Sequence, residues 1–267
     1  MKFPVYLHFG PWAVQAHLFF ELLAYAAAYR VYKILRDVYG DHVDDGLRWW
    51  VIAAAAVGGL LGGRILGLLE NPQNLVGHWG DPQVWLGGGK TIVGALLGGL
   101  IAVELAKKLL GVSRRTGDLF AVPLCVGIAI GRIGCFLEGM DDHTYGVATT
   151  LPWGVDFGDG VARHPTQIYE IIFVVILGAL LFRWMRRPHV EGDIFKGFMV
   201  SYLAFRFAIE FLKPDPRVLL GLSSIQWACV VGLLYYARDV ARWLRSSSVE
   251  ASREFAIPSQ SDLAGRQ

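Results

Sequence analysis

Residues 49–69 read WWVIAAAAVGGLLGGRILGLL, and Arg64 is the only charged residue among them. An α-helix needs about 20 apolar residues to cross the hydrocarbon core of a bilayer, so this stretch predicts a membrane span. The 32 glycines of the chain point the same way, because glycine lets transmembrane backbones approach closely. The whole chain has the same character, because 54% of its 267 residues are hydrophobic. The net charge of only +2 gives no field suited to a nucleic-acid partner.

The same pattern recurs along the chain and predicts an all-α, polytopic membrane protein with about seven transmembrane helices. The predicted spans are Ala13–Leu35, Trp49–Leu69, Thr91–Leu110, Leu119–Leu137, Gln167–Trp184, Phe195–Leu212 and Val218–Tyr236. Residues 71–89 contain two prolines and two tryptophans and are expected to form an outer interfacial or re-entrant arm. We expect one transmembrane domain over residues 1–245 and a polar, disordered cytoplasmic tail over residues 246–267.

The distribution of lysine and arginine predicts the orientation, because positive residues are retained on the cytoplasmic side. Basic residues are concentrated in alternate loops and in the tail: Arg30, Lys33, Arg36 and Arg48; Lys107, Lys108, Arg114 and Arg115; Arg183, Arg186, Arg187 and Lys196; and Arg238, Arg242, Arg245 and Arg253. We therefore expect a multi-pass protein of the plasma (inner) membrane with its N-terminus outside and its C-terminus in the cytoplasm.

Ionisable residues within the predicted spans gather near their outer ends. Such residues are costly in a bilayer unless they are paired or line a polar cavity. Helical spacing places His17 and Glu21 one turn apart, and it places Tyr202, Arg206 and Glu210 on one helix face. The remaining members of the set are Arg64, Lys90 and Arg132, on three further spans.

Two interpretations of these charges are open. In the first, neighbouring residues form local pairs that neutralise each other, namely His17 with Glu21 and Arg206 with Glu210. In the second, basic groups from separate helices share one anionic ligand. The second interpretation accounts for at least four basic groups at one depth. A phospholipid phosphate is the abundant anion there, and the guanidinium fork fits its oxygens. We therefore expect a lipid-headgroup cavity facing the extracytoplasmic leaflet.

Two segments carry most of the information about function. Residues 131–139 read GRIGCFLEG and lead into a polar loop, and residues 163–170 read RHPTQIYE at the outer start of the fifth span. In this order and on this topology they resemble the hallmarks of the prolipoprotein diacylglyceryl transferase family, Gly-Arg-x-Gly-Asn-Phe and Arg-His-Pro-Ser-Gln-x-Tyr-Glu. The resemblance covers nearly the whole chain.

The resemblance implies a transferase that moves a diacylglyceryl group from phosphatidylglycerol, or a related anionic phospholipid, to the lipobox cysteine thiol of a prolipoprotein. It implies no cofactor. Arg132 and Arg206 would hold the lipid phosphate, and we expect Lys90 and Arg64 to add positive charge. We assign catalytic roles to His17, Glu21, Arg206 and Glu210, and site-shaping roles to Cys135, Glu138, Tyr202, Arg163 and His164.

The chain departs from the family pattern within the expected site. Val93 stands at the position of the family's proposed catalytic histidine, Cys135 at that of an asparagine, and His17 at that of a tyrosine. Because valine cannot transfer a proton, we hypothesise that His17, made more basic by Glu21, accepts the proton of the acceptor thiol. The alternative is that His17 and Glu21 pair only to bury each other.

Other classes of function follow if that hypothesis fails. One is a divergent paralogue that binds or handles anionic phospholipid without this chemistry. A small-solute transporter is disfavoured, because the charges gather at one leaflet and not at the midplane. The acidic residues from Glu138 to Asp142, with His143, are interpreted as a solvated outer loop, so no metal ligand set is expected.

Overall fold

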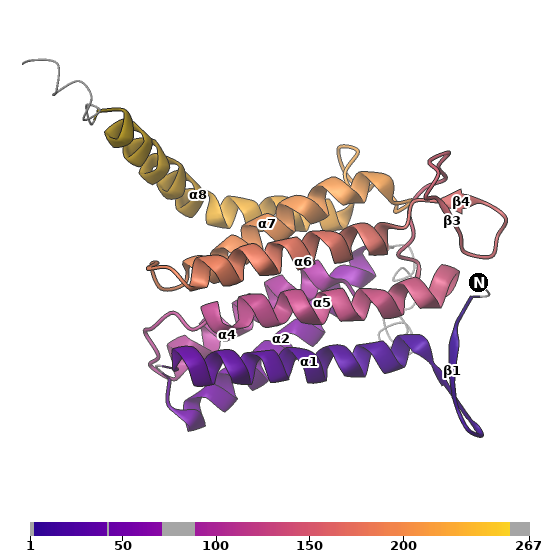
Figure 1. Cartoon of the computed structure of the whole chain (residues 1–267), viewed down its shortest axis with the longest axis horizontal. Coiled ribbons are helices and arrows are strands. Elements are labelled where there is room, and N and C mark those ends of the chain that lie inside the picture. Colours follow the sequence, from indigo (N-terminus) through magenta and orange to yellow (C-terminus); the bar gives the residue numbers. More distant parts are fainter. Residues whose placement is uncertain (1–2, 42, 71–88, 257–267) are drawn as a thin grey trace, which may run out of the picture.

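The computed structural model describes residues 3–41, 43–70 and 89–256, with side chains up to residue 245. Within these residues, seven α-helices run along the long axis of the molecule (Figure 1). They are α1 (Ala16–Tyr39), α2 (Asp45–Glu70), α4 (Ile92–Leu109), α5 (Asp118–Glu138), α6 (Thr166–Met185), α7 (Asp193–Ile209) and α8 (Ser224–Ala256). The short 3-10 helices η2 (Gly139–Asp142) and η3 (Glu210–Leu212) continue α5 and α7.

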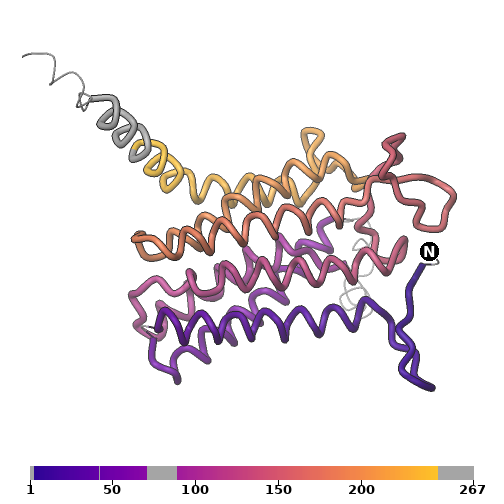
Figure 2. Tube along the Cα trace, in the orientation of Figure 1, coloured from indigo at the N-terminus to yellow at the C-terminus, as the bar shows by residue number. Residues whose placement is uncertain are grey.

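Two small antiparallel hairpins lie at one end of the bundle. Strands β1 (Tyr6–Phe9) and β2 (Trp12–Gln15) precede α1, and strands β3 (Val155–Asp156) and β4 (Ala162–Arg163) lie between α5 and α6. The start of α1, the end of α5 and the start of α6 meet at this end (Figures 1 and 2). We call it the hairpin end. It holds most of the residues predicted to form the site.

The helices match the seven predicted stretches, with differences at their ends. The first helix begins at Ala16 and not at Ala13, because residues 12–15 pair with residues 6–9 as β2. The last begins at Ser224 and not at Val218, because Leu219 and Leu222 form a tight turn ahead of it. It continues to Ala256, through the first part of the expected tail. Residues 257–267, and almost all of the expected arm over 71–89, lie outside the described residues.

The exterior of the bundle is apolar, as expected of a membrane protein. Among the described residues, α2, α6 and the segment Asp118–Asp142 are long and apolar enough to cross a bilayer. Large hydrophobic side chains on α2 and α6 are more than half exposed, including Leu60, Ile65, Ile172 and Leu180. Such a surface suits contact with lipid. The number of spans and their orientation remain predictions.

Glycines allow helices α2 and α4 to touch through their backbones. A Cβ atom on Gly62 would lie 2.3 Å from the carbonyl oxygen of Gly94, and one on Gly94 would lie 2.3 Å from that of Gly62. Gly58 and Gly98 face each other in the same way one turn along. The close backbone approach expected of glycines in membrane spans therefore occurs here, and this contact holds the end of α2 beside the start of α4.

Candidate active site

Arg132 lies in the last turns of α5 and is paired with a carboxylate on α6. Its Nε is 2.8 Å from Oε2 of Glu170, and both side chains are less than one-tenth exposed. The hydroxyl of Tyr202, on α7, donates a 2.6 Å hydrogen bond to the other oxygen of Glu170. Three helices therefore meet at one buried carboxylate, which holds the guanidinium in place.

A second pair lies at the end of α7. Arg206 Nη1 is 3.0 Å from Glu210 Oε2, and Glu210 is fully buried. The hydroxyl of Ser223, just before α8, donates a 3.1 Å hydrogen bond to Oε1 of Glu210. The predicted i, i+4 pair is confirmed, and Tyr202, Arg206 and Glu210 all face the interior of the bundle as predicted.

The two arginines converge on the same region. Glu170 interacts electrostatically with both guanidinium groups, and the arginines repel each other. Arg132 Nε and Arg206 Nη1 each lie against a buried carboxylate, so each arginine is paired through one nitrogen. The two guanidinium groups therefore place fixed positive charge from two helices in one buried region.

A third group surrounds His17 at the start of α1. Its Nε2 is 3.9 Å from Glu21, and its Nδ1 is 3.4 Å from Oδ1 of Asp142 in η2. Arg132 Nη1 donates a long hydrogen bond of 3.7 Å to the sulfur of Cys135. Because the Cys135 sulfur also lies within 4.8 Å of a His17 nitrogen, Cys135 joins the Arg132 pair to the His17 group.

The other predicted site residues surround this centre. Lys90 is 59% exposed, and its ammonium group is 3.7 Å from Glu21. Glu138 is buried and accepts a hydrogen bond from the amide of Gln15 at the end of β2. Arg64 is half-buried in α2. A phosphate contact of Lys90 or Arg64 stays a prediction.

Arg163 and His164 lie in and just after β4, in the polar connection between α5 and α6. Both guanidinium nitrogens Nε and Nη2 of Arg163 donate hydrogen bonds to Asp159, at 3.0 and 2.6 Å. These bonds lower the pKa of the Asp159 carboxyl. His164 Nδ1 is 3.1 Å from the hydroxyl of Tyr169. Both residues therefore belong to the hairpin connection, and their site-shaping role stays a prediction.

Two important members of the site were missing from the sequence-based assignment. Glu170 closes the quoted segment RHPTQIYE, and the need of buried Arg132 for a counter-charge was the signal that could have identified it. Asp142 was assigned to a solvated loop, but it is only 12% exposed and faces His17. A cavity of about 220 Å³ lies at the opposite end of the bundle beside Arg48, Asp118 and His189. None of the site residues lines it.

The fold and the site together define a helical membrane protein that gathers arginine–carboxylate pairs at one end of its bundle. The family model for prolipoprotein diacylglyceryl transferase matches residues 4–238. This chain belongs to the prolipoprotein diacylglyceryl transferase family, as its two motif segments indicated.

Several bacterial proteins named phosphatidylglycerol–prolipoprotein diacylglyceryl transferase are similar to this chain over most of their length. The protein from Clostridium tetani is 35% identical over 197 residues, which are 68% of this chain and 77% of the relative. The protein from Solidesulfovibrio magneticus is 34% identical over 250 residues, which are 86% of this chain and 88% of the relative. The protein from Bordetella avium is 33% identical over 236 residues, with coverage of 84% and 88%.

Proposed function

We propose that this protein transfers the diacylglyceryl group of phosphatidylglycerol, or a related anionic phospholipid, to the lipobox cysteine thiol of a prolipoprotein. Its membership of the family and the names of its relatives support this activity. The observation that carries the proposal within the molecule is the pair of buried guanidinium groups, Arg132 and Arg206, which come from separate helices and both interact electrostatically with Glu170.

The two arginines bind the lipid phosphate in this proposal. Glu170 and Glu210 hold the guanidinium groups through one nitrogen each, and the other guanidinium nitrogens bind the phosphate oxygens. When the bond between the glycerol carbon and the phosphate oxygen breaks, negative charge grows on that oxygen. Fixed cations in a buried site stabilise such charge strongly, because water does not screen them. Arg132 and Arg206 therefore favour the departure of glycerol phosphate.

The acceptor thiol has to lose its proton before its sulfur attacks the glycerol carbon, because the thiolate is the nucleophile. Val93 is fully buried in the apolar core and offers no proton acceptor. We assign the deprotonation to His17 together with Glu21. His17 is about one-third exposed, so an acceptor peptide can reach it. Cys135 and Arg132 connect it to the phosphate-binding part of the site.

The hairpin end faces the outside of the inner membrane in this proposal. Basic residues dominate the connections at the opposite end of the bundle, as the rule for cytoplasmic loops requires. A green fluorescent protein fused after residue 245 should fluoresce in a bacterial host, and alkaline phosphatase fused at the same residue should be inactive. The reverse pattern would contradict this orientation.

Lipidation of a model prolipoprotein tests the activity directly. The protein is expressed in a bacterium depleted of its own diacylglyceryl transferase, and the mass of the model prolipoprotein is measured. Wild-type protein should add one diacylglyceryl group, and Arg206→Lys, which keeps the charge but removes the fork, should reduce the yield at least tenfold. The matched control is Arg114→Lys, at an exposed pair with Glu191. No added mass with correctly inserted wild-type protein would contradict the proposed function.

The position of Val93 favours one second candidate, a protein that binds anionic phospholipid without transferring its diacylglyceryl group. In that case the wild-type protein would retain phosphatidylglycerol during purification but would leave the prolipoprotein unmodified. Arg132→Ala and Arg206→Ala should weaken retention of the lipid under both candidates.

A further inference from the structure

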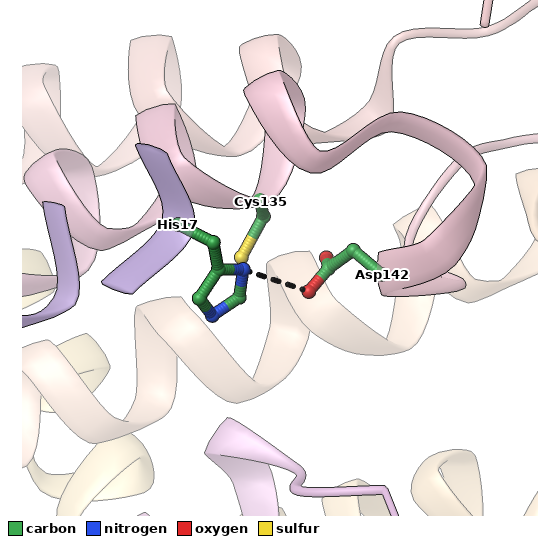
Figure 3. Close-up of side chains that lie close together, drawn as sticks. All are labelled: His17, Cys135 and Asp142. Atoms are coloured by element: carbon green, nitrogen blue, oxygen red, sulfur yellow. Dashed lines mark ion pairs between the residues drawn. The ribbon is translucent and has the colours of Figure 1, made fainter. Parts of the chain in front are cut away.

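Three side chains of different chemistry converge at the hairpin end: His17, Cys135 and Asp142. One nitrogen of His17, the sulfur of Cys135 and one carboxylate oxygen of Asp142 all lie within 4.8 Å of one another. Figure 3 shows the sulfur and the carboxylate turned toward the same edge of the imidazole ring. The nearest measured contact is 3.4 Å, between His17 Nδ1 and Asp142 Oδ1.

The backbone fixes this arrangement. A Cβ atom on Gly134 would lie 3.2 Å from both the Cα and the carbonyl oxygen of His17, so α1 and α5 are in close backbone contact beside the cluster. The hydroxyl of Thr144 donates a hydrogen bond to the carboxylate of Asp142. That hydroxyl in turn accepts a 3.1 Å bond from the amide of Gln167. The carboxylate of Asp142 is therefore held by a surrounding shell, as metal-binding side chains are, and the backbone contact fixes His17 beside α5.

We propose that His17, Cys135 and Asp142 bind a divalent transition-metal ion, for which zinc is the best match, and leave its fourth coordination position to a thiol of the substrate. Zinc accepts imidazole, thiolate and carboxylate ligands, whereas calcium and magnesium prefer oxygen alone. Three protein ligands with one position left for water or substrate are typical of catalytic zinc. Tetrahedral bonds would bring the ligand atoms to about 3.5 Å from one another, so the cluster has to contract by about 1 Å.

Charge and hydrogen bonding around the cluster fit such an ion. A thiolate and a carboxylate balance its two positive charges, and the Arg132 guanidinium lies 3.7 Å from the sulfur. The other imidazole nitrogen, Nε2, faces Glu21 at 3.9 Å. A metal-bound histidine commonly directs its second nitrogen to a carboxylate in this way. Glu21 thereby gains a role that does not require it to touch the substrate.

This inference rests on the proposed function, and it specifies how the acceptor thiol is activated. With the metal bound, His17 acts as a ligand and Glu21 orients it, and zinc takes over from His17 the activation of the thiol. A thiol that coordinates zinc loses its proton, here to water. The thiolate sulfur then forms a bond to the glycerol carbon. The bond from that carbon to the phosphate oxygen breaks, and its electron pair leaves with glycerol phosphate beside Arg132 and Arg206. The metal ion changes neither its charge nor its protein ligands.

Binding of zinc and cobalt to the purified protein in phosphatidylglycerol nanodiscs tests the site without requiring activity. After treatment with a chelator, the wild-type protein should rebind one zinc ion per chain. Cobalt should give a near-ultraviolet charge-transfer band, because its thiolate ligand is Cys135. Cys135→Ser should abolish this band, and Asp142→Asn should weaken zinc binding by about tenfold or more.

Matched variants separate the site from general damage to the fold. Cys125→Ser changes a buried thiol elsewhere in α5, and Asp141→Asn changes the exposed acid next to Asp142. Both should retain the charge-transfer band and wild-type affinity for zinc. A wild-type protein that binds no zinc, or a Cys135→Ser variant that binds zinc as well as Cys125→Ser does, would overturn the proposed site.

The lipidation assay distinguishes failure of this inference from failure of the proposed function. If zinc activates the thiol, removal of the metal should stop lipidation, and added zinc should restore it in the wild-type protein but not in Cys135→Ser. Full lipidation by protein shown to be metal-free would overturn the activating role while leaving the transferase activity intact. Zinc binding with no lipidation by the metal-loaded protein would instead overturn the proposed function and the role of zinc in it.

Discussion

Replacing Glu170 with alanine should destabilise the folded protein by about 3–5 kcal/mol, because it leaves the buried guanidinium of Arg132 without its counter-charge. The ion pair is 2.8 Å long, and its side chains are 7% and 4% exposed, so water cannot take the place of the lost carboxylate. The hydroxyl of Tyr202 also loses its acceptor, which adds about 1 kcal/mol. Unfolding in mixed micelles with increasing sodium dodecyl sulfate, followed by tryptophan fluorescence, measures the change.

Two further variants separate burial from charge. Glu191→Ala breaks an exposed pair with Arg114, whose side chains are 52% and 58% exposed, and should cost less than about 1 kcal/mol. The double variant Arg132→Met with Glu170→Met should regain much of the stability, because no buried charge is left unpaired. It should still fail to lipidate the prolipoprotein. If Glu170→Ala unfolds no more easily than Glu191→Ala, the assignment of a buried, structurally required pair is wrong.

Three other changes test separate parts of the structure. Gly62→Ala places a methyl group 2.3 Å from the carbonyl oxygen of Gly94 and should lower the free energy of unfolding by about 1–3 kcal/mol in the same assay. The control is Gly59→Ala, whose new methyl group would lie 3.4 Å from the nearest atom, and it should lower this free energy by less. Ser223→Ala removes the hydroxyl that bonds Glu210 and caps α8, for a loss of about 1–2 kcal/mol, and Ser224→Ala is its control. The bonds to Arg163 lower the pKa of the Asp159 carboxyl in the folded protein. These bonds therefore stabilise the fold at pH values above the ordinary carboxyl pKa, and the stabilisation is lost as the pH falls through the lowered pKa of the folded protein. The difference in melting temperature between wild type and Asp159→Asn should vanish in that acid range; a difference that persists would refute the pKa assignment.

The sequence by itself determined the helical membrane class, the approximate helix positions and the family. Those properties depend on local patterns: the length of apolar runs, and motifs such as residues 163–170, which are continuous in the chain. It also identified Arg206 with Glu210, because residues four apart on a helix are neighbours whatever the tertiary structure. The N-terminal hairpin was not predicted, because strand pairing over so few residues depends on the helices beside it.

Only the tertiary structure decided which charges from different helices meet. Arg132 had no visible partner in its own segment, and its counter-charge, Glu170, comes from the next helix. His17 and Cys135 are far apart in sequence and became neighbours of Asp142 because Gly134 lets α1 and α5 touch. Contacts between distant segments depend on how helix surfaces pack, and a single sequence does not encode that packing in any local pattern. For this reason the sequence indicates the arginines and their common depth, whereas the contacts of Arg132 with Glu170 and of His17 with Asp142 are visible only in the folded chain.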